Sequence, residues 1–498
     1  MKCPRRTQGL IGAILLALPL ASPAPSAAPP DAARKEAVAI IGRAEFKGGL
    51  IVHVARNQQD ADLTAALADG PARIVHALCE DAALVRHMRE RFDALGLAGR
   101  VTAEHLRSSQ LPLVDDTVSL FVSGDPCPAA HDEILRALSP RGVACIRRDG
   151  EWATTVKPWP DDIDEWTHYL HGPGGNPVSR DRRIGPPAHL QWLGSPAYLR
   201  HHDHMSGLSA MVSARGRLYY IMDLGPRWSV QMPPEWTLIA RDAFNGVILW
   251  QRPIDKWHPH LWPLKRGPSQ VLRRLIAEGD RTYVTLGVGA PVSVIDGATG
   301  ADIATLPDTA GTEEMILSDG ILFAVVNPDL DAYRTMPTDS VEAIRSAGRD
   351  WNWDERPRRI VAIEATTGRQ LWQIESPVAP GALAAANGQP VSELKMNGVN
   401  LLPYLSGKEK KPPHEMLFWR IGDKCAMRQG NLKMLRQGGT PWELYDLASD
   451  IKEAKNLAGE KPELVESLGK LYTSWSDELS EPRWKPTPRA RRAGGARK

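Results

Sequence analysis

Histidines are concentrated in one stretch of this sequence, where eight of the fourteen lie between positions 168 and 260. Side chains alternate along an extended strand, so His202 and His204 would share one face, as would His258 and His260. Neutral imidazole is a common ligand of zinc, copper and iron, which makes a transition-metal site one hypothesis. Its candidate ligands are His201, His202, His204, His258 and His260.

The alternative is structural. Tryptophans are interleaved with these histidines, so the imidazoles could equally be half-buried and hydrogen-bonded with no metal among them. Their spacing matches no standard ligand pattern, and it leaves both possibilities open.

Three repeated segments follow, each with an acid four residues before a glycine. This pattern predicts a hairpin turn in which the acid accepts hydrogen bonds from backbone N–H groups and the glycine adopts a positive φ. The acid and glycine pairs are Asp242 and Gly246, Asp296 and Gly300, and Glu364 and Gly368. Four residues after the glycine stand Trp250 and Trp372, while the middle copy has Ala304.

These repeats resemble the blades of quinoprotein-type (PQQ-like) β-propellers. The wider stretch 37–378 resembles a group of exported bacterial proteins, typical of planctomycetes, that join a degenerate methyltransferase-like domain to such a propeller. The resemblance is carried by residues 159–171, 185–192, 200–205, 241–246 and 257–265. It implies a quinone as a possible cofactor, beside the transition metal that the histidines suggest. Three turns are fewer than the four to eight blades of a closed ring, so we expect residues 156–378 to form a partial propeller.

Alternating strand and helix patterns over residues 37–155 predict an α/β domain with a parallel sheet. The expected strands are 49–54, 74–78, 118–122 and 143–146, and the expected helices are 60–68 and 81–95. The order resembles a class I methyltransferase domain. Asp115 and Asp116 precede the strand at 118–122, which corresponds to the family's fourth strand, and residues 138–142 precede the strand at 143–146, which corresponds to its fifth.

That methyltransferase family binds S-adenosylmethionine through a glycine-rich loop after its first strand, and a carboxylate after the second strand holds the ribose. The loop here, residues 55–60, contains no glycine, although Glu80 or Asp81 stands at the carboxylate position. We therefore expect a degenerate domain that does not bind S-adenosylmethionine.

In the last part of the chain, residues 383–484, the sequence pattern predicts three short strands followed by a helix over 462–478. Leu464, Leu468, Leu471 and Trp475 would form its apolar stripe. The order resembles the C-terminal subdomain of arylsulfatase-type sulfatases. That family uses a Cys/Ser-x-Pro-x-Arg nucleophile and a Ca²⁺ site that lie upstream of this subdomain. None of the five cysteines here fits the motif, so we expect neither a sulfatase nucleophile nor its Ca²⁺ site in this chain.

Charge and the N-terminal segment suggest where the protein acts. Of its 498 residues, 61 are Lys or Arg and 59 are Asp or Glu, and this balance does not favour nucleic acid as a partner. Residues 1–26 read as a signal peptide, and no later apolar run is long enough to span a membrane. We expect a periplasmic or secreted protein. The basic segment 485–498 is expected to be a disordered tail that could contact a cell-surface polysaccharide.

The predicted fold class is mixed multidomain, comprising an α/β Rossmann-like domain, an all-β partial propeller and a small α+β subdomain. The favoured function is non-catalytic binding or scaffolding through the propeller. One alternative is a metal- or quinone-dependent oxidoreductase. Another is a sulfatase-related protein whose catalytic part is missing, with an exported sulfatase as partner. The change of character near residue 380 leaves a real fusion, a gene rearrangement and an assembly error open.

Overall fold

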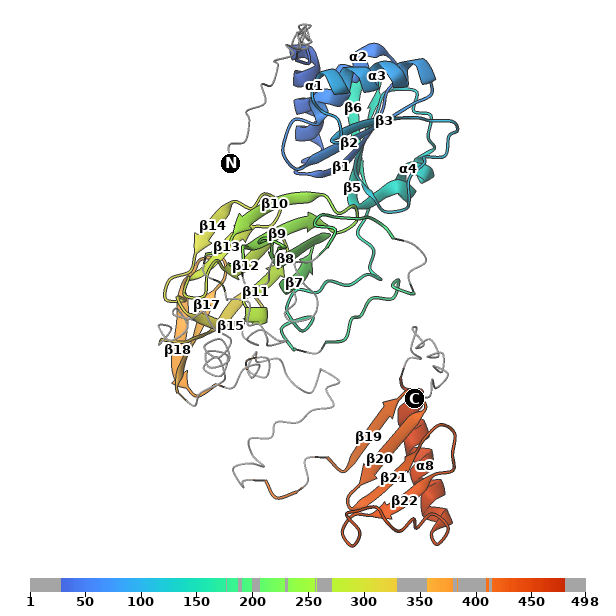
Figure 1. Cartoon of the computed structure of the whole chain (residues 1–498), viewed down its shortest axis with the longest axis vertical. Helices are drawn as coiled ribbons and strands as arrows, with labels where there is room; N and C mark the ends of the chain where they lie inside the picture. Colours follow the sequence, from blue (N-terminus) through green and yellow to red (C-terminus); the bar gives the residue numbers. More distant parts are fainter. Residues whose placement is uncertain are drawn as a thin grey trace, which may run out of the picture. The chain divides into compact units, whose positions relative to one another are not determined.

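The computed structural model describes residues 28–175, 177–186, 190–198, 207–228, 232–255, 257, 271–328, 356–378, 383, 409–411 and 414–479. The chain divides into two compact units. The first holds an α/β domain and three four-stranded antiparallel sheets, and the second holds a further four-stranded sheet with one helix (Figure 1). No helix among the described residues is long and apolar enough to cross a membrane.

The α/β domain is built on a six-stranded sheet in the order β3-β2-β1-β4-β5-β6. Its strands are β1 (Gly49–Val54), β2 (Arg73–Cys79), β3 (Val101–His105), β4 (Val118–Ser123), β5 (Leu138–Arg148) and β6 (Glu151–Val156). Neighbouring strands from β3 to β5 run parallel, and β6 pairs antiparallel with β5. The predicted Rossmann-like α/β fold is therefore confirmed, with its change of strand order between β1 and β4.

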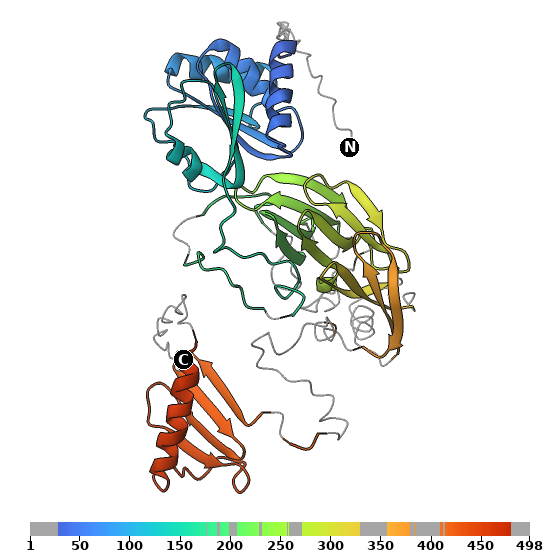
Figure 2. The ribbon, with the colours of Figure 1, turned by 180° about the vertical axis from the view of Figure 1, so that it is seen from behind.

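Helices cover both faces of this sheet. They are α1 (Asp31–Arg43), α2 (Gln58–Leu67), α3 (Ala82–Ala94) and α4 (His131–Ala137). Figures 1 and 2 show α1, α2 and α3 together on one side, where they bury the core that contains Ile40, Leu67 and Met88. Helix α4 packs Ile134 and Ala137 into a separate core on the other side. Helix α1 was not predicted, and it starts before residue 37, where the domain was expected to begin.

Three antiparallel sheets follow, each with its strands in simple meander order. The first contains β7 (Leu208–Ala214), β8 (Arg217–Asp223), β9 (Trp236–Asp242) and β10 (Ile248–Pro253). The second contains β11 (Leu275–Glu278), β12 (Arg281–Thr285), β13 (Val292–Asp296) and β14 (Asp302–Thr305), and η1 (Val271–Arg273) precedes it. The third contains β15 (Thr312–Ser318), β16 (Ile321–Val326), β17 (Arg358–Glu364) and β18 (Gln370–Ser376).

The repeated acid-to-glycine segments are the turns between the third and fourth strands of these sheets. Gly246, Gly300 and Gly368 have φ of +74°, +75° and +73°, a conformation that side chains with a Cβ resist. Asp242 accepts from the backbone N–H of Phe244 at 2.9 Å, and Asp296 accepts from that of Thr299 at 2.8 Å.

A tryptophan ring lies against two of these turns. Trp192 covers Gly246 and donates through Nε1 to the carbonyl of Ala243 at 3.0 Å. Trp250 covers Gly300 and donates to the carbonyl of Gly297, also at 3.0 Å. Ala243 and Gly297 each directly follow the acid of their turn, so the two contacts are equivalent. The Trp250 ring therefore joins the first and second sheets, and Trp192, which lies outside the sheets, repeats the same arrangement on the first turn.

The C-terminal unit consists of β19 (Met416–Ile421), β20 (Lys424–Gln429), β21 (Leu432–Arg436), β22 (Glu443–Asp446) and helix α8 (Pro462–Asp477). It has four strands instead of the three expected, and Gly430, with φ of +57°, lies in the tight turn of the β20–β21 hairpin. The helix buries Leu468 and Tyr472 against Met427, Met434 and Leu444. The predicted stripe was wrong at Leu471, which is 37% exposed.

Candidate functional site

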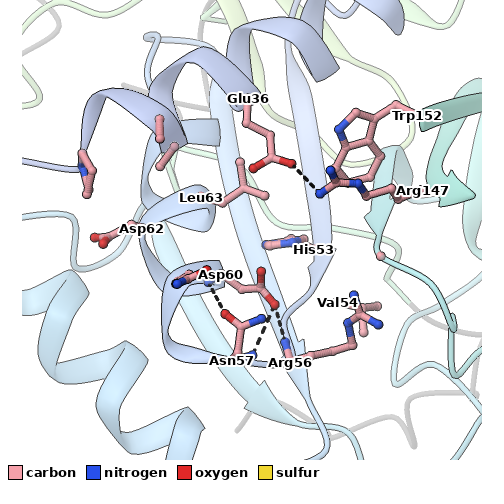
Figure 3. Close-up of a pocket in the computed structure, with 15 residues that line it drawn as sticks. Glu36, His53, Val54, Arg56, Asn57, Asp60, Asp62, Leu63, Arg147 and Trp152 are labelled. Carbon is pink, nitrogen blue, oxygen red and sulfur yellow. Dashed lines mark hydrogen bonds and ion pairs between the residues drawn. The ribbon is translucent and has the colours of Figure 1, made fainter. Parts of the chain in front are cut away.

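A cavity of about 450 Å³ opens at the carboxyl ends of β1 and β4. These strand ends mark the change of strand order, where ligands of doubly wound α/β sheets bind. Several elements line it, namely β1, the loop that follows it, the first turn of α1, the start of α2, and the β5–β6 hairpin (Figure 3). The polar side chains that matter below are Glu36, His53, Arg56, Asp60 and Arg147.

His53 is the most deeply buried of these side chains, with only 2% exposed. Its Nδ1 lies 2.8 Å from the hydroxyl of Thr64, which donates its own proton to the carbonyl of Asp60 at 2.7 Å. Thr64 therefore accepts from His53, and Nδ1 carries the ring proton. Nε2 is left as an acceptor, and no described group hydrogen-bonds to it. Burial lowers the pKa of His53 to about 4, so the ring is neutral at ordinary pH.

The loop after β1 is held by its own side chains. Asn57 accepts from the backbone N–H of Asp60 at 3.1 Å, while Asp60 accepts from the backbone N–H groups of Arg56 and Asn57 at 2.7 and 3.3 Å. This capping box fixes the start of α2 without a glycine. The local sequence thus accounts for the conformation of the loop.

Arg56 reaches from this loop across to the end of β4. Its guanidinium donates to the carbonyl of Asp125 and occupies the space beside Gly124, where a Cβ would lie 2.1 Å from Nη2. No acidic side chain within the described part of the chain forms an ion pair with Arg56. Arg56 therefore places a guanidinium without an ion-pair partner at the switch point of the sheet, while the Asp60 carboxylate accepts from its backbone N–H.

The other charged groups of the cavity are already engaged. Arg147 pairs with Glu36 at 3.3 Å, and its guanidinium lies over the ring of Trp152 at 5.8 Å. Asp62 pairs with Arg91 at 2.9 Å. Asp60 is used in the capping box. The lining thus combines a guanidinium without an ion-pair partner, the capping-box carboxylate of Asp60, an acceptor on His53, and an apolar side formed by Leu63 and the alanines of α1.

The described geometry does not fit S-adenosylmethionine. The loop after β1 lacks the glycines that allow a close approach, and the cationic Arg56 side chain lies beside Gly124, where it would repel a sulfonium. At the carboxylate position, Asp81 caps α3 by accepting from Ala83 at 2.7 Å, and His105 Nε2 lies 3.0 Å from the carbonyl of Glu80. We therefore derive no methyl-transfer step for this domain.

The predicted metal ligands His201, His202, His204, His258 and His260 lie outside the described residues. Among the residues that are described, no group of three or more His, Cys, Asp or Glu side chains is placed to hold a metal ion. Two neighbouring histidines of the same stretch are described. His171 Nε2 lies 2.6 Å from Asp164, and the buried His168 accepts from the backbone N–H of Leu317 at 3.0 Å.

His168 belongs to a tripeptide that contacts all three antiparallel sheets. The carbonyl of Trp166 accepts from Ser213 on β7 at 2.7 Å, and that of Thr167 accepts from Ala277 on β11 at 3.0 Å. The third contact is the hydrogen bond from Leu317 on β15. In each case the donor is the second-last residue of the first strand of its sheet. The tripeptide 166–168 thus satisfies strand-edge N–H groups that would otherwise be unpaired.

The first of the repeated turns also contacts the α/β domain. Asn245 donates to the carbonyl of Thr117 at 3.0 Å and to the hydroxyl of Ser119 at 2.8 Å, and Ser119 donates to Asp242 at 2.9 Å. Burial raises the pKa of Asp242, although these donors oppose the rise. Gly49 is required beneath this contact, because a Cβ there would lie 2.3 Å from the Ser119 hydroxyl.

The cavity residues were not predicted as a site. His53 lies within a β-branched run that predicts a buried strand, and Glu36, Arg56 and Arg147 come from separate elements. The one available indication was an ionisable side chain inside an otherwise apolar strand.

Comparisons with known proteins find similarity in solved structures. A methyltransferase described as S-adenosyl-L-methionine-dependent from Methanococcus maripaludis is 21% identical, with a TM-score of 0.21, over 23% of this chain and 53% of that one. A SAM-dependent methyltransferase from Aquifex aeolicus is 18% identical, with a TM-score of 0.20, over 23% and 67%. Geranyl diphosphate C-methyltransferase from Streptomyces coelicolor is 14% identical, with a TM-score of 0.20, over 22% and 43%.

This chain spans about half the length of the first of these solved structures. No protein-family model matches the chain, and no curated protein matches it.

Proposed function

We propose that this chain is an exported, non-catalytic binding protein. Its α/β domain holds a ligand at the switch point of the sheet, and its three antiparallel sheets act as a propeller-like scaffold. The observation that carries the proposal is Arg56, which bridges the ends of β1 and β4 where a transferring enzyme needs an open cofactor crevice. The cavity offers groups that hold a ligand, namely a cation, a neutral imidazole and an aromatic ring.

The scaffold part of the proposal is supported by the contacts between elements. One turn fastens the first sheet to the α/β domain through Asp242 and Asn245, and the tripeptide 166–168 ties the three sheets together. Such fixed contacts suit a protein that presents a binding site rather than one that closes over a substrate. A cell-surface polysaccharide and an exported sulfatase are the partners that we propose for the assembled chain.

We expect purified full-length protein to show no binding of S-adenosylmethionine. Isothermal titration calorimetry should give no saturable heat with S-adenosylmethionine or S-adenosylhomocysteine at millimolar concentration. The Arg56→Gly variant, which removes the cation and restores a glycine to the loop, provides the matched comparison. Saturable binding by the wild-type chain would show that Arg56 does not exclude the cofactor and would contradict the proposal.

We also expect the purified protein to contain far less than one transition-metal ion per chain. The five histidines outside the described residues are the ligands on which the oxidoreductase alternative depends. Elemental analysis by mass spectrometry after periplasmic expression and gel filtration measures this content. A stoichiometric metal that disappears in a His202→Ala, His204→Ala double variant would favour the oxidoreductase over the binding protein.

A further inference from the structure

The chemistry of the cavity points to one class of ligand. We propose that it binds a hydroxylated carboxylic acid of sugar size, a hexuronic acid, whose carboxylate pairs with Arg56 while a hydroxyl donates to Nε2 of His53. This inference rests on the proposed function, and it names the ligand of the same site.

The carboxylate is assigned from the charges. Arg56 is the one charged lining residue within the described part of the chain that has neither an opposite side chain nor a capping role. Glu36 neutralises Arg147, Arg91 neutralises Asp62, and Asp60 accepts from two backbone N–H groups. An anionic ligand would therefore give the Arg56 guanidinium the ion-pair partner that it lacks. A guanidinium favours a planar carboxylate because its donors match the two oxygens.

The hydroxyl is assigned from His53. The hydrogen bonds through Thr64 hold the proton on Nδ1, so Nε2 can only accept. A ligand atom at this point must be a donor, which a carboxylate oxygen is not. A hydroxyl on the same ligand would donate to Nε2. Figure 3 shows the ring of His53 among Leu63, Asp60 and Arg147, which also line the cavity.

The size and the apolar side of the cavity favour a ring over a short acid. The volume of about 450 Å³ falls within the range of small-molecule sites, about 300–1,000 Å³. Trp152 and Leu63 offer apolar surface for the C–H groups of a sugar ring. A two-carbon acid would reach Arg56 and leave the rest of the cavity to water.

Calorimetry with full-length protein tests the proposal with four probes, D-glucuronate, D-glucose, acetate and an oligouronate. We expect saturable binding of glucuronate, with glucose and acetate at least about tenfold weaker, because each lacks one of the two assigned groups. If the oligouronate binds more tightly than the monosaccharide, the source of the ligand is a glycan end rather than a free sugar acid. Equal affinity for acetate or for glucose, or no binding of any uronate, overturns the proposal.

Two variants assign the groups. Arg56→Gln should weaken glucuronate binding by about tenfold or more, and His53→Phe by about threefold to tenfold. Arg86→Gln, on the exposed side of α3, is the matched control and should bind as wild type does. Circular dichroism checks that the His53→Phe variant folds. If His53→Phe does not fold, the Arg56→Gln variant alone still tests the proposal. Unchanged affinity in Arg56→Gln overturns the proposal.

The same mixtures separate this inference from the proposed function. Mass spectrometry of the recovered sugar reports any chemical change. A modified sugar would contradict the non-catalytic function while leaving the ligand assignment intact. Absence of uronate binding, with S-adenosylmethionine also not bound, would overturn the ligand assignment alone.

Discussion

Replacing Trp250 by alanine is expected to destabilise the three-sheet part of the chain by about 3–5 kcal/mol. The ring is 8% exposed and covers Gly300, and its Nε1 donates to the carbonyl of Gly297 at 3.0 Å. Truncation leaves a cavity between the first and second sheets and removes this hydrogen bond. Urea unfolding followed by circular dichroism measures the change in the free energy of unfolding.

Trp372 is the matched control, because it stands at the same position of the third repeat. Its side chain is 47% exposed, and its ring lies against that of Phe323 in its own sheet, with the ring centroids 5.9 Å apart. Trp372→Ala should therefore cost less than about 1 kcal/mol. Equal losses in the two variants would mean that the contact of the Trp250 ring with the next turn contributes little.

The repeated turns show how much of the fold could be predicted. An acid and a glycine four residues apart specify a local backbone conformation, so a short sequence is sufficient to predict a turn. The α/β strands are similarly local, since runs such as that around Ile51 and Val52 are β-branched and become fully buried. Helix α1 was missed because its apolar residues, mostly alanine, form no clear stripe: Val38 is exposed, and only Ala37 and Ile40 are buried.

The candidate site could not be predicted in the same way, because its residues are distant in sequence. Arg147 and Glu36 are separated by 111 positions, and only the closure of the sheet brings them together. Histidine spacing favoured the region around residue 202 because clustering is visible in a sequence. The neutral charge of His53 results from burial, and its proton position results from the hydrogen bond to Thr64. Neither the burial nor this contact is visible in the sequence.

Acid is expected to destabilise the protein through His168, by about 3 kcal/mol between pH 6.5 and pH 4. Burial lowers the pKa of His168 from 6.5 to about 4, and the nearby His171 acts in the same direction. The unfolded chain therefore binds this proton before the folded chain does. The contribution to stability is fully present above pH 6.5 and is lost as the pH falls toward 4. His53, whose pKa is lowered similarly, adds a second loss in the α/β domain.

The His168→Gln variant isolates the first of these losses. Glutamine can accept from the backbone N–H of Leu317 through its side-chain oxygen, but it does not titrate, so the tripeptide 166–168 keeps its bond to β15. Urea unfolding at pH 7.5, 5.5 and 4.5 (spanning the expected window) should show a shallower pH dependence in this variant than in wild type. The exposed His131→Gln variant should follow wild type. If His168→Gln and wild type lose stability in parallel, the pKa of His168 does not differ between the folded and unfolded chains, and the ring is not held buried and neutral against β15.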